Sequence, residues 1–228
     1  KGDVTTSNKL GYTGDIKVGA SEASTSTPSV TNYAVALYTD KQGTKGSEVT
    51  IENNLTVGEK GVGLFAGNDS NLIYDTGTIT VNTNSTGGTG IYVAPPTQKT
   101  PATTPPTYNN SSVHLKSNIV TNGDNAAGAI VGQNGEFTFD NAATMTFNGS
   151  GVAMYGFKDS IINDNGGTIL NPNGDAVERI RTHGGRLDIQ NGVTMTIPSG
   201  QILYHSENGQ VNNDLGATIT DGGITGNK

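Results

Sequence analysis

The sequence has no cysteine and no tryptophan among its 228 residues, and aromatic side chains make up only 6% of it. Without cysteine, the chain can form neither a disulfide framework nor a thiolate metal site. The lack of cysteine also suits a protein that must cross an oxidising compartment unfolded. The hydrophobic content of 32% is low for a globular core. It is sufficient for a solenoid, whose core is a thin column of stacked side chains.

Positive charge is also scarce. Lys and Arg total 13 against 20 Asp and Glu, which gives a formal net charge of −7. Nucleic acids and anionic membrane surfaces bind basic faces, so this charge argues against both as partners. No window of 18 consecutive apolar residues occurs, and we therefore expect no segment to insert into a membrane as a helix.

The sequence also lacks a signal peptide at its start and an obvious capping segment at either end. Solenoids normally need caps. We therefore expect Lys1 and Lys228 to be cuts within a longer protein.

Glycine, in contrast, is abundant at 33 residues, and the chain repeats itself. An aliphatic anchor flanked by Thr or Asn recurs along its whole length. The anchors are Ile16, Leu55, Ile79, Ile119, Met145, Ile169, Met195 and Ile219. Five of the seven steps between them are 24 to 26 residues, and each of the two longer steps contains an insertion. Self-similarity at a fixed period is the signature of a repeat architecture.

Two further columns keep the same period. Six residues before the anchors stand Leu10, Val49, Ile73, Val113, Phe139, Asn163, Ile189 and Asn213. After the anchors comes a bulky column: Tyr38, Phe65, Tyr92, Ile130, Tyr155, Ile180 and Tyr204. Clusters of Gly, Asn and Asp separate the apolar patches, so each repeat is predicted to contain three short strands and three turns.

This pattern predicts an all-β fold: a right-handed, three-sided parallel β-helix of about eight rungs of 24–26 residues, spanning residues 1–228 as a single segment. A hairpin architecture is the alternative, but it would not bring the same residue type back at this interval. Insertions at about 20–31 and 94–110 are expected to leave the rod as loops. The second holds five of the eight prolines, which cannot donate to a β-ladder.

Three stretches resemble the repeats of bacterial autotransporter passenger domains, most closely those of the large fusobacterial outer-membrane adhesins. They are Gly-Val-Gly-Leu-Phe-Ala at 61–66, Gly-Thr-Ile-Thr-Val at 77–81 and Gly-Thr-Gly-Ile-Tyr-Val at 88–93. The resemblance covers nearly the whole chain but consists of structural repeats, so it carries over no site residues. It implies secretion across the outer membrane, a C-terminal β-barrel elsewhere in the parent protein, and display on the cell surface.

The bulky column provides the first candidate binding surface. Alternation along the strands places Tyr38, Phe65, Tyr92 and Tyr155 on the outside, where stacked rings would suit sugar faces or a host-protein surface. The alternative is that the strands bend there and the rings pack at a corner of the rod or in its core.

The segment 178–186 provides the second candidate surface, because it contains all three arginines of the chain. Aligned on the repeat, Arg179 stands where Met154 and Leu203 stand. Guanidinium groups on Arg179 and Arg181 would suit the recognition of carboxylate or sulfate, as in an acidic glycan. The alternative is local pairing with Glu178, Asp188 or Glu207.

Two other functional classes have weaker support. Threonine pairs at 78/80, 144/146, 194/196 and 218/220 resemble an ice-binding ladder, but Asn118, Val120 and Leu170 interrupt it. Polysaccharide-degrading β-helix enzymes need converging carboxylates. The only plausible cluster is Asp140, Asp159 and Asp164, and each of these also reads as a turn residue.

We expect no catalytic residues, no cofactor and no metal site, because His114, His183 and His205 are too scattered in the repeat to form a metal triad. The sequence therefore predicts a monomeric adhesin segment, surface-displayed or secreted, that binds a host glycan or protein receptor. The alternatives are a structural spacer whose parent protein carries recognition elsewhere and, third, a polysaccharide-degrading enzyme.

Overall fold

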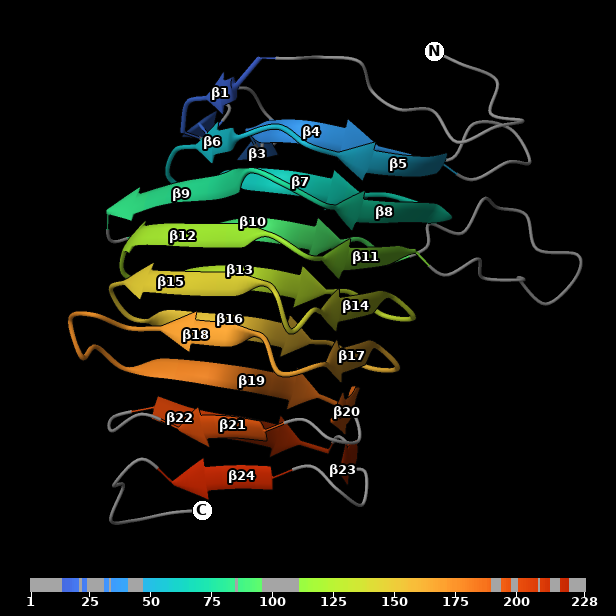
Figure 1. The fold of residues 1–228 in the computed structure, drawn as a ribbon. Helices are drawn as coiled ribbons and strands as arrows, with labels where there is room; N and C mark the ends of the chain where they lie inside the picture. The colour runs from blue at the N-terminus through green and yellow to red at the C-terminus, as the bar shows by residue number, and fades with distance from the viewer. Residues whose placement is uncertain are drawn as a thin grey trace, which may run out of the picture.

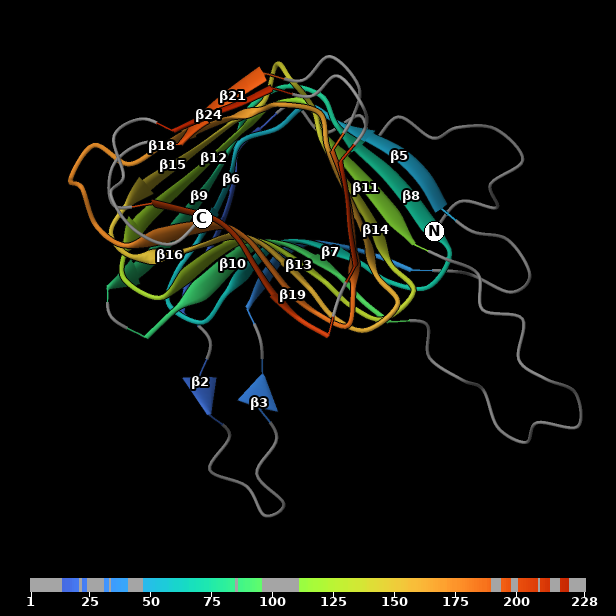
Figure 2. The ribbon, with the colours of Figure 1, turned by 90° about the horizontal axis from the view of Figure 1, so that it is seen from below.

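The computed structural model describes residues 14–20, 22–23, 31–32, 34–40, 47–84, 86–95, 111–189, 194–197, 201–208, 210–213 and 218–221. All regular structure in these residues is β-strand, and the strands stack into a rod with three parallel sheets (Figure 1). Viewed from the end of the rod that carries β24, the chain turns counterclockwise as it approaches the viewer (Figure 2). The predicted right-handed, three-sided parallel β-helix is confirmed. The described residues include no helix able to cross a membrane.

Each large sheet takes one strand from each successive rung. The first contains β1 (Ile16–Val18), β6 (Leu55–Val57), β9 (Thr78–Asn84), β12 (Asn118–Gly123), β15 (Thr144–Asn148) and β18 (Thr168–Leu170). The second contains β4 (Val35–Thr39), β7 (Val62–Ala66), β10 (Gly88–Val93), β13 (Ala126–Val131), β16 (Gly151–Gly156), β19 (Val177–His183) and β22 (Gln201–Glu207). The third contains β5 (Ser47–Ile51), β8 (Ser70–Tyr74), β11 (Ser112–Leu115), β14 (Glu136–Phe139), β17 (Ile161–Asp164), β20 (Arg186–Ile189) and β23 (Gln210–Asn213).

Among the residues that the structure describes, six rungs place a strand in all three sheets, slightly fewer than the eight predicted. In the next rung, β22 and β23 extend the second and third sheets, while β21 (Thr194–Ile197) pairs with β24 (Thr218–Asp221) in a separate two-stranded sheet. Met195 and Ile219 are paired in that sheet, so the period of the anchors continues there.

The anchors form the core as predicted. Ile79, Ile119 and Met145 are in register on neighbouring strands and are fully buried. The Thr residues that flank Ile79 and Met145 face outward, because successive side chains of a strand point to opposite faces. Toward the end of the same strands, Asn82, Asn122 and Asn148 form an amide ladder. Nδ2 of Asn122 donates to Oδ1 of Asn82, and Nδ2 of Asn148 donates to Oδ1 of Asn122, both at 2.9 Å.

The predicted column six residues before the anchor mixes two faces of the third sheet. Leu72 faces the core in register with Val113, whereas Ile73 is 37% exposed. Asn163 likewise lies between the buried residues Ile162 and Asp164. A fixed offset fails because the turn from the third sheet to the first has three residues after β8 but only two after β11 and four after β14.

In the second sheet, the predicted bulky column slips by one residue at its C-terminal end. Ile180 and Tyr204 are in register with the inward Met154, while Arg181 and His205 continue the outward column of Tyr155. Both columns carry bulky residues here, so residue size alone did not distinguish the two faces.

A column of small residues lies next to this core and explains how the second sheet packs. Gly63, Gly90, Gly128 and Ala153 occupy equivalent positions on successive rungs. A Cβ atom on Gly90 would lie 2.6 Å from the carbonyl oxygen of Gly128, so no larger residue fits without movement. The residue at this position in the next rung is Arg179.

Part of each predicted insertion lies within the described residues. β2 (Glu22–Ala23) and β3 (Thr31–Asn32) form an antiparallel pair that stands away from the three sheets (Figure 2). Ala94 still belongs to the rod: it is 8% exposed, and its N–H donates to the carbonyl of Ala66 at 2.8 Å. Residues 24–30 and 96–110 lie outside the described residues.

Candidate functional site

The outer face of the second sheet carries a stack of aromatic rings. Tyr38, Phe65 and Tyr92 are in register on β4, β7 and β10. The ring centroids of Tyr38 and Phe65 are 5.0 Å apart, and those of Phe65 and Tyr92 are 5.3 Å apart, with interplanar angles of 27° and 28°. Parallel rungs bring equivalent side chains to about 4.8 Å, which is close enough for stacking.

The rings face outward, which is the first of the two arrangements that the sequence left open. Tyr38 is 56% exposed and Phe65 and Tyr92 are partly exposed, whereas the neighbouring inward residues Leu64 and Ile91 are fully buried. The hydroxyl of Tyr38 donates to Oδ2 of Asp40 at 2.8 Å. Partial burial, followed by this hydrogen bond to a carboxylate, raises the pKa of Tyr38. A binding role for these residues stays a prediction.

Tyr155 belongs to the same column but not to the ring stack, because Ile130 separates it from Tyr92. Its partner is Phe157, at a centroid distance of 4.9 Å and an interplanar angle of 71°. This edge-to-face pair forms part of the wall of a groove on the outer face of the sheet.

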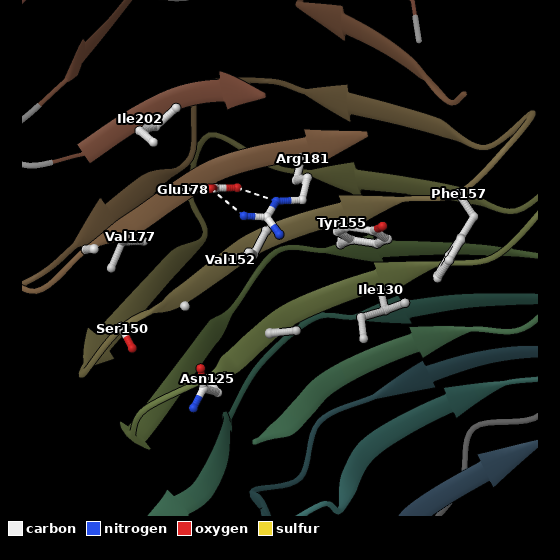
Figure 3. Close-up of a pocket in the computed structure, with 14 residues that line it drawn as sticks. Asn125, Ile130, Ser150, Val152, Tyr155, Phe157, Val177, Glu178, Arg181 and Ile202 are labelled. Atoms are coloured by element: carbon white, nitrogen blue, oxygen red, sulfur yellow. Dashed lines mark hydrogen bonds and ion pairs between the residues drawn. The ribbon is translucent and has the colours of Figure 1, made fainter. Parts of the chain in front are cut away.

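The groove has a volume of about 510 Å³ and crosses β13, β16, β19 and β22 (Figure 3). One side is formed by residues of the turns that precede the strands: Asn125, Ser150 and Ala176. The other side is formed by the outward column of Ile130, Tyr155 and Arg181. Between them lie Ala127, Val152 and Glu178, which are in register, with Ile202 beyond. Small residues at Ala127 and Gly151 leave the space open.

Hydrogen bonds hold the turn side of the groove in place. Oδ1 of Asp124 accepts from the backbone N–H of Ser150 at 2.9 Å and from its hydroxyl at 3.0 Å, which ties one turn to the next. The backbone bond, followed by the hydroxyl bond, lowers the pKa of Asp124. The groove therefore has a preformed rim.

The charged groups that line the groove are Glu178 and Arg181, and they pair with each other. Nε of Arg181 donates to Oε2 of Glu178 at 2.6 Å, and Nη2 donates to Oε1. The hydrogen bonds to Glu178 are the main reason that the pKa of Arg181 is raised. The third guanidinium nitrogen takes no part in these two bonds and points toward the side of the groove at Val152 (Figure 3).

Further ionisable groups lie beyond this pair. Nδ1 of His205 is 3.9 Å from Oε1 of Glu178, and its Nε2 is 3.6 Å from Oε1 of Glu207. His183 is 3.1 Å from the other oxygen of Glu207. Arg181 thus lies among carboxylates, and the predicted alternative of local pairing describes its surroundings.

Arg179 does not lie on the surface with Arg181. Only 7% of it is exposed: it continues the buried column of Ala153, one residue before the position of Met154 that the alignment of the repeats gave it. Its Nε and Nη2 donate to the two oxygens of Asp164 at 2.7 and 2.9 Å, and Nη2 also donates to the carbonyl of Gly167 at 2.8 Å. Its guanidinium lies 5.5 Å from the centroid of the Phe139 ring. The expectation that Arg179 contacts an external anion is therefore corrected.

The three aspartates considered for catalysis do not form one site. Asp164 is fully buried and bound by Arg179. Asp140 accepts from the backbone of Ala142 at 3.0 Å and lies 2.8 Å from His114. Asp159 lies in a turn with a positive φ of 58°. Among the residues that the structure describes, no group of three or more His, Asp or Glu is arranged to hold a metal ion.

The groove itself was not predicted from the sequence. Val152, Phe157 and Glu178 were not candidates. A local signal was present: the groove residues Ala127, Val152 and Glu178 stand three residues before Ile130, Tyr155 and Arg181, and the first two of them are small or apolar. Comparisons of the chain with protein-family models, curated proteins and solved structures find no match. The geometry of this face is therefore the basis for a functional assignment.

Proposed function

We propose that this chain is a segment of a bacterial adhesin of the autotransporter type, displayed on the cell surface, that binds a host receptor as a monomer and without catalysis. The observation that carries the proposal is the outward stack of Tyr38, Phe65 and Tyr92. Exposed aromatic rings in contact with each other provide a wide apolar surface with polar tips, which is typical of recognition surfaces.

The fold supports this reading because it makes the surface rigid. Phe65 and Tyr92 stand on strands that are paired on both sides within the second sheet, and the strand of Tyr38 pairs with that of Phe65. The rings therefore lose little conformational freedom on binding, which reduces the entropic cost of association. A rod also holds such a face away from the surface to which it is attached.

The alternative is a spacer, whose outer face would have no partner. Adhesion of the 228-residue chain to epithelial cells distinguishes the two readings. We expect the chain to bind, and the double variant Tyr38→Ala/Tyr92→Ala to lose most of that binding. Ile73→Ala is the matched control, because Ile73 is an exposed apolar residue on a different sheet. Equal adhesion by the chain and the double variant, or no adhesion by either, would support the spacer.

A further inference from the structure

The groove over β13, β16, β19 and β22 has a wall of apolar and aromatic residues and one ion pair. Its volume of about 510 Å³ lies within the range of about 300–1,000 Å³ that ligand pockets occupy. Such pockets combine apolar walls with a few polar groups that fix the orientation of the ligand. Here those groups are Glu178 and Arg181, beside the ring of Tyr155 (Figure 3).

The charge in the groove determines which class of ligand fits. Glu178 and Arg181 cancel formally and form two hydrogen bonds with each other. The side chain of Glu178 is only 15% exposed, so the pair lies partly out of water. A carboxylate or sulfate would have to compete with Glu178 for the guanidinium, on a protein of net charge −7. An anionic ligand is therefore disfavoured.

A purely apolar ligand is disfavoured for the opposite reason. It would cover the carboxylate and guanidinium without replacing their hydrogen bonds to water, and such desolvation costs free energy. An extended peptide that recognises a sheet commonly adds to its edge. The groove lies instead on the face of the second sheet, where β13, β16 and β19 are paired on both sides.

From these observations, we infer that the groove binds an uncharged sugar unit. A hydroxyl group both donates and accepts, so adjacent hydroxyls match a fixed carboxylate beside a guanidinium. The less polar face of the ring packs on Tyr155, with Val152 and Ile130 beside it. The groove crosses four successive strands at about 4.8 Å each, which leaves room for more than one sugar ring along the rod.

This inference rests on the proposed function, because it names a ligand class for the same outer face. It moves recognition of the ligand's polar groups from the ring stack to Tyr155, Glu178 and Arg181. It also replaces the acidic glycan predicted for the arginines with a neutral one.

Matched pairs of neutral and acidic glycans test it directly. We would measure binding of the 228-residue chain to immobilised mannan, which is neutral, and to two matched pairs. In these pairs, asialofetuin and dextran are the neutral members, and fetuin and dextran sulfate are the acidic ones. The expected result is binding to at least one neutral probe, with the acidic member of a pair binding no better. Stronger binding to fetuin or dextran sulfate than to their neutral partners would overturn the inference.

Three variants locate the site. Glu178→Gln removes the charge of the carboxylate at constant shape, Tyr155→Ala removes the ring, and Ala127→Gln fills the space between the walls. Each is expected to weaken binding of the neutral probe by about tenfold or more, as loss of one charged hydrogen bond or one ring contact does. Ile73→Ala is expected to bind as the parent chain does. Because Ala127 is an outward residue on the face of the sheet, its variant separates loss of binding from loss of folding, which a melting curve checks.

Failure of this inference can be distinguished from failure of the proposed function. If the chain adheres to cells through Tyr38 and Tyr92 while no neutral probe binds, or while the three groove variants bind neutral probes unchanged, the inference is wrong and the adhesin proposal remains. If neither cells nor probes bind, both are wrong.

Discussion

Arg179 lies inside the β-helix, with its Nε 2.7 Å from Oδ2 of Asp164. The two residues belong to successive rungs, and Asp164 occupies the column that holds Tyr74, Leu115 and Phe139 in the rungs before it. A buried ion pair thus replaces apolar side chains at one level of the core.

We expect Arg179→Met to lower the free energy of unfolding by about 3–5 kcal/mol, because it leaves the carboxylate of Asp164 buried and unpaired. The double variant Arg179→Met/Asp164→Leu should recover most of this loss, since an apolar pair of similar volume needs no hydrogen bonds. Urea unfolding measures both. Arg186→Met is the control, because its pair with Asp188 is about half exposed at the arginine and should change stability by less than about 1 kcal/mol. A loss for Arg179→Met as small as that of the control would contradict the prediction.

The column of small residues in the second sheet predicts that Gly90→Ala is destabilising. The new Cβ would lie 2.6 Å from the carbonyl oxygen of Gly128 and 3.0 Å from Cγ2 of Ile119, so backbone and side chain must move. Overpacking of this kind costs about 1–3 kcal/mol. Thermal unfolding measures the effect. Gly19→Ala is the matched control, since no atom lies within 4 Å of its Cβ position, and it should be neutral or slightly stabilising.

Asp140 should make stability depend on pH. Burial alone would raise its pKa, but the bonds from the Ala142 N–H and His114 outweigh burial, and the pKa is lowered from 3.8. A carboxylate with a depressed pKa in the folded state stabilises the fold above its unfolded value and loses this contribution as pH falls through the folded value. Asp140→Asn is therefore expected to cost about 1 kcal/mol at pH 7. This difference should narrow at pH values below 3.8.

Urea unfolding of the parent chain and of Asp140→Asn at neutral and acidic pH tests this pH dependence. Glu48→Gln, at an exposed position of the same sheet, provides the control for a general effect of charge removal. If the difference in the free energy of unfolding between the parent chain and Asp140→Asn stayed constant as the pH was lowered, the pair with His114 would not be its cause.

The amide ladder predicts that the loss of stability depends on how many of its hydrogen bonds a substitution removes. Asn122 donates to Asn82 and accepts from Asn148, so Asn122→Ala removes two hydrogen bonds and leaves two amides without these partners. We expect a loss of about 1–2 kcal/mol. Asn82→Ala removes one of the two bonds and should cost about half as much in the same thermal unfolding experiment. Equal losses of stability for the two variants would contradict the prediction that each hydrogen bond of the ladder contributes separately.

The period of the anchors was sufficient to predict the fold. A residue such as Met145, flanked by Thr144 and Thr146, defines both a strand and its inward face, and repetition every 24 to 26 residues can be satisfied by parallel stacking of rungs. The same alternation predicted that Tyr38, Phe65 and Tyr92 face outward. These features depend on local sequence and regular repetition, so they can be read without knowing which turns intervene.

Only the tertiary structure decided the register near the C-terminal end and the shape of the outer face. Turn lengths vary from rung to rung, so counting along the chain could not distinguish Arg179 from Ile180 at the inward position of Met154. Arg179 continues the buried column of Ala153 and binds Asp164 in the core, whereas Arg181 continues the outward column of Tyr155 and binds Glu178 in the groove. The groove exists because Ala127 and Gly151, which are small and lie on neighbouring rungs, leave space between its two sides. Coiling of the chain, and not proximity in the sequence, brings these rungs together.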